Sequence, residues 1–435
     1  MIMSSTNPKK DDSYSSKSPA KWRMSDTVWM LSLYGTAIGA GVLFLPINAA
    51  AGGLIPLLVI TVLAFPMTYF SHRALCRFVL SGNAASMQRE DITAVVEEQF
   101  GQTMGYLITI LYFFAIFPIL LVYSVGITNT AHSFIKYQLG MTPPSRALIA
   151  FILIAFLMTI IQFGEKLIVR VMSALVFPFV ITLMLIALSL IPQWTGDIFH
   201  FNATNISGSH NLLLTLWLTI PVAVFAFNHS PIISSLAVAK RNEYGVALAE
   251  SKCSQIIKYS NIMMVITVMF FVFSCAFCLS PANLAEAKAQ NISVLSYLAN
   301  HFHTPFLDWV APILAFVAIC KSFLGHYLGA KEGFNGLVHK TLKFFNKTIQ
   351  EKTLNKIALL FMAVCSWIIA TINPSILSMI ESIGGPILAM ILFIMPMYAI
   401  HTIPSLQKYR GKPSNIFIVI MGIIAISAAL YHFFV

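Results

Sequence analysis

The sequence predicts an all-α polytopic membrane protein, and three observations lead to this fold class. Of the 435 residues, 58% are hydrophobic and only 10% are charged, whereas roughly a quarter of a typical soluble chain is charged. Apolar runs of about 20 residues, each long enough to cross a bilayer as a helix, follow one another along the chain. Two of these runs are interrupted near their centres by residues that break helices. We therefore expect a bundle of membrane helices, two of which are discontinuous.

The apolar runs predict eleven transmembrane helices, preceded by a polar segment over residues 1–26 that reads as a disordered cytoplasmic tail. We find no short hydrophobic core followed by a small-residue cleavage site, so a cleaved signal peptide is not expected. The spans lie near 27–48, 54–79, 103–133, 146–163, 167–191, 211–239, 256–280, 306–330, 355–373, 376–401 and 414–434.

The basic residues predict the orientation of these spans. With the N-terminus inside, 23 of the 27 Lys and Arg residues fall on the cytoplasmic side, as the positive-inside rule requires. The C-terminus is then periplasmic. A net charge of +11 could indicate a nucleic-acid partner in a soluble chain, but orientation explains it here without one.

The first interrupted span contains the segment Gly39-Ala40-Gly41 at its centre. Glycine lowers helix propensity, and a half-helix beginning here would direct free N–H groups and a positive dipole end at an anion such as a carboxylate. Gly35 and Gly39 also fit the small-x-x-x-small pattern of close helix packing, which is the alternative interpretation.

The second interruption is Phe227-Asn228-His229-Ser230-Pro231, in the sixth span. Ser230 followed by proline is typical of an N-cap and the start of a second half-helix, which leaves Asn228 and His229 in the gap. His229 could bind a ligand or could only satisfy unpaired carbonyls. Paired interruptions in two halves of a membrane protein are the best sequence pointer to a transported substrate, so the sequence favours a transporter.

Four polar residues in other spans are further candidates. Tyr123 lies about two-thirds across span three, where it could touch a substrate or bond a neighbouring helix. Lys321 lies about 22 Å into span eight at 1.5 Å per residue, where a charge costs about 2.5–3.5 kcal/mol, and His326 follows it. Snorkelling is the alternative for Lys321. Glu381 in span ten is either an outer gate group or an interfacial residue.

Some polar residues are expected to have only structural roles. His72 and Arg73 close the second span, with Arg77 nearby, and are expected to be interfacial anchors. Cys275 and Cys278 form a C-x-x-C, but it sits in an apolar helix interior without a second ligand pair. We expect packing there and no metal site.

Three blocks of sequence resemble the hydroxy/aromatic amino acid permease family of the amino acid–polyamine–organocation superfamily, and among its branches the bacterial proton-coupled serine transporters most closely. The blocks are Leu33–Pro46, Phe227–Ser235 and Lys321–Ala330, and the resemblance runs from about Trp22 to the C-terminus. The tail before Trp22 and the loop 195–210 do not clearly match.

The resemblance implies a LeuT-like fold in a bacterial inner membrane. Spans 1–5, residues 27–191, and spans 6–10, residues 211–401, would form inverted repeats with discontinuous spans 1 and 6. Span 11, residues 414–434, would be appended. The resemblance also implies symport of L-serine with protons in place of sodium, which the spacing of residues alone does not give. No cofactor is expected, and a monomer would suffice, although the oligomeric state stays open.

These expectations combine into a mechanism. The serine carboxylate would meet N–H groups from Gly39 to Gly41 and the Thr36 hydroxyl, and the ammonium would meet carbonyls freed around Ala226 to Asn228. Asn228, His229 or Tyr123 would bond the serine hydroxyl. Desolvation makes a buried lysine easier to deprotonate, so Lys321 is the first candidate for the coupling group, with His229 and His326 as rivals because histidine titrates near neutrality.

Three alternatives remain open. Threonine or an aromatic amino acid could be the main substrate of the same kind of transporter. A membrane-embedded enzyme is possible, but no H-E-x-x-H or G-x-S-x-G motif occurs in the sequence. A channel would also carry polar groups at mid-membrane depth, but it would not accumulate a solute against its gradient.

Overall fold

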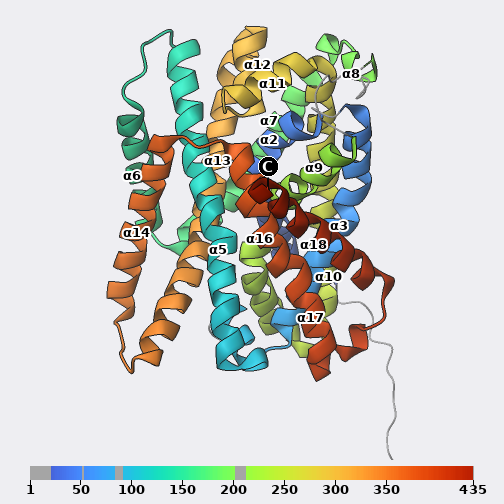
Figure 1. Cartoon of the computed structure of the whole chain (residues 1–435), viewed down its shortest axis with the longest axis vertical. Helices are drawn as coiled ribbons and strands as arrows, with labels where there is room; N and C mark the ends of the chain where they lie inside the picture. Colours follow the sequence, from blue (N-terminus) through green and yellow to red (C-terminus); the bar gives the residue numbers. More distant parts are fainter. Residues whose placement is uncertain (1–20, 51–52, 84–91, 201–211, 435) are drawn as a thin grey trace, which may run out of the picture.

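The computed structural model describes residues 21–50, 53–83, 92–200 and 212–434, and these residues form helices and their connections without a strand. The predicted tail therefore lies outside the described residues as far as residue 20. Its last residues are ordered, because the first helix begins at Met24 and not at 27. Figure 1 shows a helical bundle with most helices running along the long axis.

The longer helices carry the bundle, and short segments connect them. Their bounds are α1 Met24–Ala37, α2 Ala40–Ala49, α3 Leu54–Leu80, α5 Ile92–Tyr137, α6 Arg146–Gln162, α7 Glu165–Ser189, α9 Leu212–Ala226, α10 Ile233–Cys278, α13 Pro305–Phe344, α14 Glu351–Ile372 and α18 Pro413–Phe434. The short helices are α8 Asp197–His200, α11 Pro281–Ala289, α12 Val294–Phe302, α15 Ile376–Met379, α16 Gly385–Ala389 and α17 Met395–Thr402. The tenth predicted span is composite, with π-helical turns at Ile380–Gly384 and Met390–Ile394.

Two of the long helices turn sharply at a glycine. Gly101 in α5 has φ 78° and Gly245 in α10 has φ 74°, a left-handed conformation that favours glycine. Beyond Gly245, α10 runs back as the seventh predicted span, so α10 contains the end of the sixth predicted span and nearly all of the seventh.

Seven helical segments of the described residues are long and apolar enough to cross a membrane, or eight if the bent pair α1–α2 is one span. Arg146–Gln162 and Pro413–Ala428 are apolar but shorter. One of the seven is the long segment Leu213–Cys278, which includes both the break before Ser230 and the turn at Gly245. The structure supports a multi-pass membrane protein, in agreement with the predicted class.

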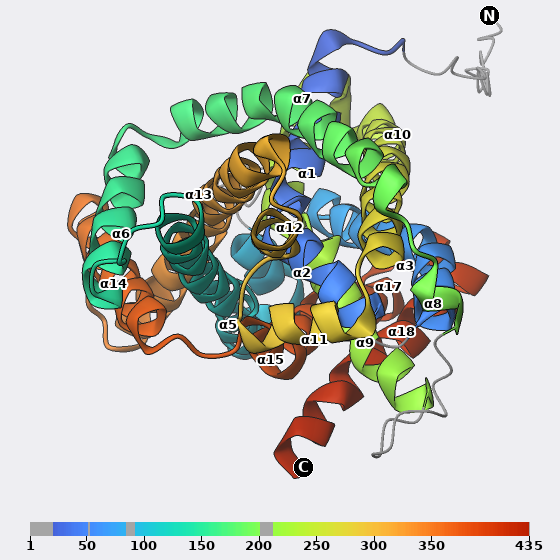
Figure 2. The ribbon, with the colours of Figure 1, turned by 90° about the horizontal axis from the view of Figure 1, so that it is seen from above.

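Helices α5 and α13 pack closely against each other, and glycines on α13 permit this approach. A methyl group added at Gly333 would lie 3.1 Å from the Cα atom of Phe113, and one at Gly329 would lie 3.1 Å from Ile116 Cδ1. Small residues four apart let two membrane helices approach closely. In Figure 2 this pair lies between the outlying helices α6 and α14 and the central helices α1 and α2.

Candidate functional site

The two predicted breaks are both present, and they meet in the core. α1 ends at Ala37 and the axis of the following α2 is bent by 54°. α9 ends at Ala226, one residue before the segment 227–229. A methyl group added at Gly41 would lie 2.7 Å from the Cα atom of Ala226. The absence of a side chain at Gly41 is therefore what lets the start of α2 touch the end of α9.

The first break faces two other helices of the bundle. A methyl group at Gly39 would collide with the Ser322 hydroxyl on α13 and would lie 3.0 Å from Tyr123 Cε1 on α5. Ser322 Oγ donates a hydrogen bond to the Ile38 carbonyl at 2.8 Å, which satisfies one carbonyl freed by the break. The first N–H groups of α2, from Ala40 onward, have no acceptor within their own helix. The structure shows the close packing at this break, and anion binding by the N–H groups of α2 stays a prediction.

The second break differs in detail from the predicted cap. Ser230 does not cap the half-helix with its side chain; it is the first residue of the 3₁₀ turn Ser230–Ile232, which leads into α10. The N-cap position is His229, and Asn228 Oδ1 accepts the Ser230 N–H at 3.0 Å. Asparagine readily bonds the backbone two residues on. The prediction that Ser230 is the N-cap was therefore wrong by one position.

His72 contradicts the sequence prediction. It is not an interfacial anchor but a buried residue of α3, with 1% of its surface exposed. Its ring stacks on that of His229, with the centroids 3.6 Å apart, and its Nε2 accepts the His229 backbone N–H at 3.1 Å. The sequence missed this contact because residue 72 is followed by Arg73, which suggested a helix end, whereas α3 continues to Leu80.

Three buried polar groups near the breaks have no hydrogen-bond partner in the described part of the chain. They are Asn228 Nδ2, His229 Nε2 and Lys321 Nζ. Unpaired buried polar groups are rare in native proteins and each calls for an explanation, such as a ligand, water or an ion. One donor and one acceptor therefore stand side by side in the second break.

Aromatic and imidazole rings lie around the breaks. The centroid of Tyr123 lies 6.2 Å from that of Phe225 and 5.0 Å from that of His326. His326 Nδ1 lies 2.9 Å from the Ser322 carbonyl, so this nitrogen is engaged within α13. Phe225 was not among the predicted site residues, since an apolar residue carries no signal outside its spatial setting.

Two of the predicted substrate residues are engaged locally in this conformation. The Thr36 hydroxyl donates to the Ser32 carbonyl at 2.9 Å, so it could meet a carboxylate only by rotating away from that bond. The Phe227 carbonyl lies 3.1 Å from His229 Nδ1. Both residues are buried beside the breaks.

Lys321 lies deep in the bundle on α13 and does not snorkel. Only 2% of its surface is exposed, and its Nζ lies 4.8 Å from the centroid of the Phe179 ring on α7. An ammonium group over an aromatic face is attracted by the negative charge of the ring face. Among the described residues, the Phe179 ring is thus the one group that stabilises the charged form of Lys321.

A cavity of about 1800 Å³ extends from residues close to the breaks in the sequence, such as Thr36 and Pro231, to one end of the molecule. Its inner lining includes Thr36, Pro231 and Gly325, while exposed residues such as Phe163 and Lys347 line its other end. Phe163 precedes α7 and Lys347 follows α13, and the α13–α14 connection lies at the bottom of Figure 1. A small solute at the breaks could leave through this end.

At the opposite end, α2 is joined to the π-helical turn after α15. Asn48 Nδ2 donates to Glu381 Oε1 at 2.7 Å, and Glu381 is 6% exposed. The structure thus places Glu381 in the contact between two segments and not at an open interface.

Hydrogen bonds of asparagine side chains hold the α11–α12 segment at the same end of the molecule. Asn291 donates through Nδ2 to Asn373 Oδ1 and to the Pro374 carbonyl, both at 2.9 Å, and Asn129 Nδ2 donates to the Asn291 carbonyl at 2.7 Å. In Figure 1 both helices lie at the top of the molecule, opposite the α13–α14 connection. These hydrogen bonds hold α11 and α12 to α5 and to the connection after α14.

The α11–α12 segment also carries its own bonded pair. Tyr297 Oη donates to Glu286 Oε2 at 2.7 Å. Burial, together with this carboxylate, raises the pKa of Tyr297 to about 12. The phenol therefore remains a neutral donor at physiological pH and keeps the two short helices together.

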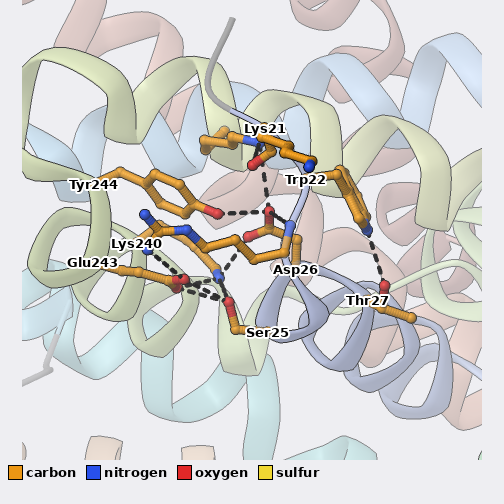
Figure 3. A network of polar contacts seen from close by, with 10 residues as sticks. Lys21, Trp22, Ser25, Asp26, Thr27, Lys240, Glu243 and Tyr244 are labelled. Atoms are coloured by element: carbon orange, nitrogen blue, oxygen red, sulfur yellow. Dashed lines mark hydrogen bonds and ion pairs between the residues drawn. The ribbon is translucent and has the colours of Figure 1, made fainter.

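A buried charge cluster ties the start of α1 to α10, and Figure 3 shows it from close by. Asp26 is fully buried; its carboxylate accepts from Lys240 Nζ at 2.7 Å and from Tyr244 Oη at 2.8 Å. Lys240 Nζ also donates to Glu243 at 2.7 Å, and Lys252 Nζ lies 3.5 Å from Asp26. This pairing could not be predicted from the sequence, because Asp26 and Lys240 are 214 residues apart.

The arrangement suits reversible binding of a small polar molecule. The start of α2 lies at the first break, and the unpaired groups of Asn228 and His229 lie at the second. The large cavity is lined by Thr36 and Pro231, which are close to the two breaks in the sequence. Among the described residues no group of three His, Cys, Asp or Glu side chains could hold a metal ion.

Comparison with known proteins places the chain among membrane transporters. The chain matches the tryptophan/tyrosine permease family over residues 27–432. It is 63% identical to the serine transporter SdaC of Escherichia coli strain K12 over 423 residues, which cover 97% of each chain. It is 50% identical to the threonine/serine transporter TdcC of Yersinia enterocolitica, over 94% of this chain and 96% of that one.

Solved structures resemble this one in fold. The manganese transporter of Eremococcus coleocola aligns with a TM-score of 0.63 and 13% identity, over 94% of this chain and 85% of that one. MhsT in complex with L-phenylalanine aligns with a TM-score of 0.57 and 15% identity, over 94% of this chain and 97% of that one. The fold is LeuT-like, as the sequence resemblance implied.

Proposed function

The chain belongs to the tryptophan/tyrosine permease family, and on that premise we propose that it is a secondary active transporter that carries L-serine into the cell together with protons. It is a membrane transporter and not an enzyme. The single observation that carries the proposal is the meeting of two helix breaks at Gly41 and Ala226. The 63% identity to a serine transporter supports serine as the substrate.

Serine would bind between the two breaks. Its carboxylate would accept from the N–H groups that begin α2, where the helix dipole favours an anion. Its ammonium would meet carbonyls around Ala226 to Asn228. Its hydroxyl would bond the unpaired Asn228 Nδ2 or His229 Nε2, with Tyr123 close by. A site that pairs a hydroxyl discriminates strongly against analogues that lack it, so alanine should compete poorly.

Threonine is the second candidate substrate. The 50% identity to a threonine/serine transporter favours it over an aromatic amino acid, and its hydroxyl could use the same groups. Threonine differs from serine by one methyl group. Whether threonine fits then depends on the space for this methyl group beside the rings of Tyr123, Phe225 and His326.

The fold in finer detail would follow the LeuT-like pattern. We assign eleven membrane crossings in two inverted repeats of five, residues 27–191 and 211–401, and one appended crossing at 414–434. With the N-terminus in the cytoplasm of a bacterial inner membrane, the large cavity opens inward and the Asn48–Glu381 contact closes the outer side. The conformation would then be one from which serine is released, with Glu381 acting at the outer gate.

Lys321 is our candidate for the coupling group. It is buried, it has no polar partner in the described part of the chain, and it neighbours Ser322, which bonds the first break. His229 and His326 remain rival proton carriers. One proton per serine supplies about 2.3 kcal/mol from a 100 mV potential and about 1.4 kcal/mol per pH unit, enough for roughly several hundredfold accumulation.

The test is uptake of radiolabelled L-serine into proteoliposomes with an inward proton gradient, with and without sodium, and with a protonophore. We expect uphill uptake that the protonophore abolishes and that sodium does not change. Threonine should inhibit it more strongly than alanine. Uptake that requires sodium, or inhibition by alanine as strong as that by threonine, would contradict the coupling or the hydroxyl recognition, respectively.

A further inference from the structure

The backbone of the second break has one donor whose acceptor comes from another helix. Within the break, the Phe227 N–H bonds the Ala223 carbonyl at 3.1 Å, and the Ser230 N–H bonds Asn228 Oδ1 at 3.0 Å. The His229 N–H instead donates to His72 Nε2 on α3 at 3.1 Å. An unpaired backbone group in the membrane core costs several kcal/mol, so this side chain stabilises the break directly.

The hydrogen bonds of His72 assign its tautomer. Its Nδ1 lies 2.8 Å from the Thr68 carbonyl, which can only accept, so Nδ1 carries the hydrogen. Nε2 then presents a lone pair to the His229 N–H. Both ring nitrogens of His72 are therefore used, one toward its own helix and one toward the break.

His72 also fixes the ring of His229. The two rings are nearly parallel, with an angle of 13° between their planes. The Nδ1 atom of His229 lies 3.1 Å from the Phe227 carbonyl, which leaves Nε2 as the one ring nitrogen without a partner in the described part of the chain. With the backbone, the ring plane and one nitrogen fixed, His229 Nε2 has a defined position in the break.

We propose that His72 is a positioning residue of the substrate site, which holds His229 so that its Nε2 is presented to the substrate hydroxyl. This inference rests on the proposed function, and it adds a residue of α3 to a site otherwise built from the breaks, α5 and α13. His72 does not contact serine; it acts through His229. It should therefore govern serine affinity more than the rate of the transport cycle.

Three substitutions distinguish the role of the His72 Nε2 acceptor from that of the His72 ring. In His72→Phe the ring remains but the acceptor is lost, in His72→Gln an amide oxygen near the position of Nε2 can accept, and in His72→Asn the side chain is too short to reach. We expect KM for L-serine exchange in proteoliposomes to rise on the order of tenfold in His72→Phe and His72→Asn, the effect of leaving a buried donor unpaired, with maximal rates within about threefold of wild type. His72→Gln should restore KM to within about threefold.

The control is Thr61→Val, which removes from the same helix a hydroxyl bonded only to the Leu57 carbonyl and should leave KM unchanged. A wild-type KM in His72→Phe, or a His72→Gln protein as impaired as His72→Asn, would overturn the inference. If His72→Phe does not fold, the Asn and Gln pair decides. A wild-type protein that exchanges no serine would instead overturn the proposed function.

Discussion

Two buried lysines of this protein, Lys240 and Lys321, differ in one respect. Lys240 is fully buried and donates to Ser25, Asp26 and Glu243 within 3.0 Å. Lys321 is almost as buried, yet its Nζ has no polar partner in the described part of the chain and faces only the Phe179 ring. A buried charge is normally paired. The paired lysine has the features of a structural element, and the unpaired one those of a group that changes its charge during function.

The largest effect is expected from removing the unpaired lysine. In Lys321→Met the chain keeps a long apolar side chain but cannot carry a proton there, so uphill serine accumulation should fall from several hundredfold to equilibrium. Exchange of external for internal serine should persist, because it needs no net proton movement. Proton-driven uptake and counterflow in proteoliposomes measure the two activities, with exposed Lys258→Met as the matched control. Wild-type accumulation in Lys321→Met would assign the coupling to another group.

Disrupting the ion pair of Lys240 should reduce stability and leave transport largely intact. Asp26→Asn keeps the shape of the cluster but removes its buried negative charge, and breaking a buried ion pair costs about 3–5 kcal/mol. We expect a lower melting temperature in detergent, while the accumulation ratio per folded protein stays within about threefold of wild type. Glu243→Gln, at the more exposed edge of the cluster, should destabilise less. Loss of accumulation without loss of stability would mean that this cluster also takes part in coupling.

The sequence predicted the breaks better than the contacts around them. Glycine and proline disfavour a helix wherever they occur, so Gly39, Gly41 and Pro231 predicted both helix breaks from the sequence alone. His72 was misplaced, because its role depends on stacking against a residue 157 positions away. The buried ion pair of Asp26 and Lys240 could not be predicted either, because hydropathy shows where a charged residue lies in the sequence but not which residue pairs with it.

Glycine at the contact between the breaks can be tested separately from the charges. In Gly41→Ala the new methyl group would lie 2.7 Å from the Ala226 Cα atom, so the two breaks must move apart. Such overpacking costs about 1–3 kcal/mol, and we expect KM for serine to rise about tenfold. Gly126→Ala on α5 is the control, because its nearest neighbour would lie at 3.5 Å. Equal effects of the two substitutions would show that the contact at Gly41 is not special.

The smallest effect is expected from the ring beneath the unpaired lysine. Phe179→Leu keeps an apolar side chain but removes a cation–π attraction of about 0.5–2 kcal/mol. The protonated form of Lys321 should then be harder to populate. Serine uptake at mildly alkaline external pH should fall about threefold, and less so at acidic pH, where protons are more abundant. Uptake rates across an external pH series measure this, and a uniform loss at every pH would point to packing alone.

A pH-sensitive dye in the vesicle lumen reports whether Lys321 moves protons during serine transport. Serine is added outside proteoliposomes without an imposed pH gradient, with potassium and valinomycin clamping the potential at zero. In wild type we predict acidification of the lumen as serine enters, and in Lys321→Met no acidification although serine still exchanges. Acidification of Lys321→Met vesicles at the wild-type rate would contradict the account.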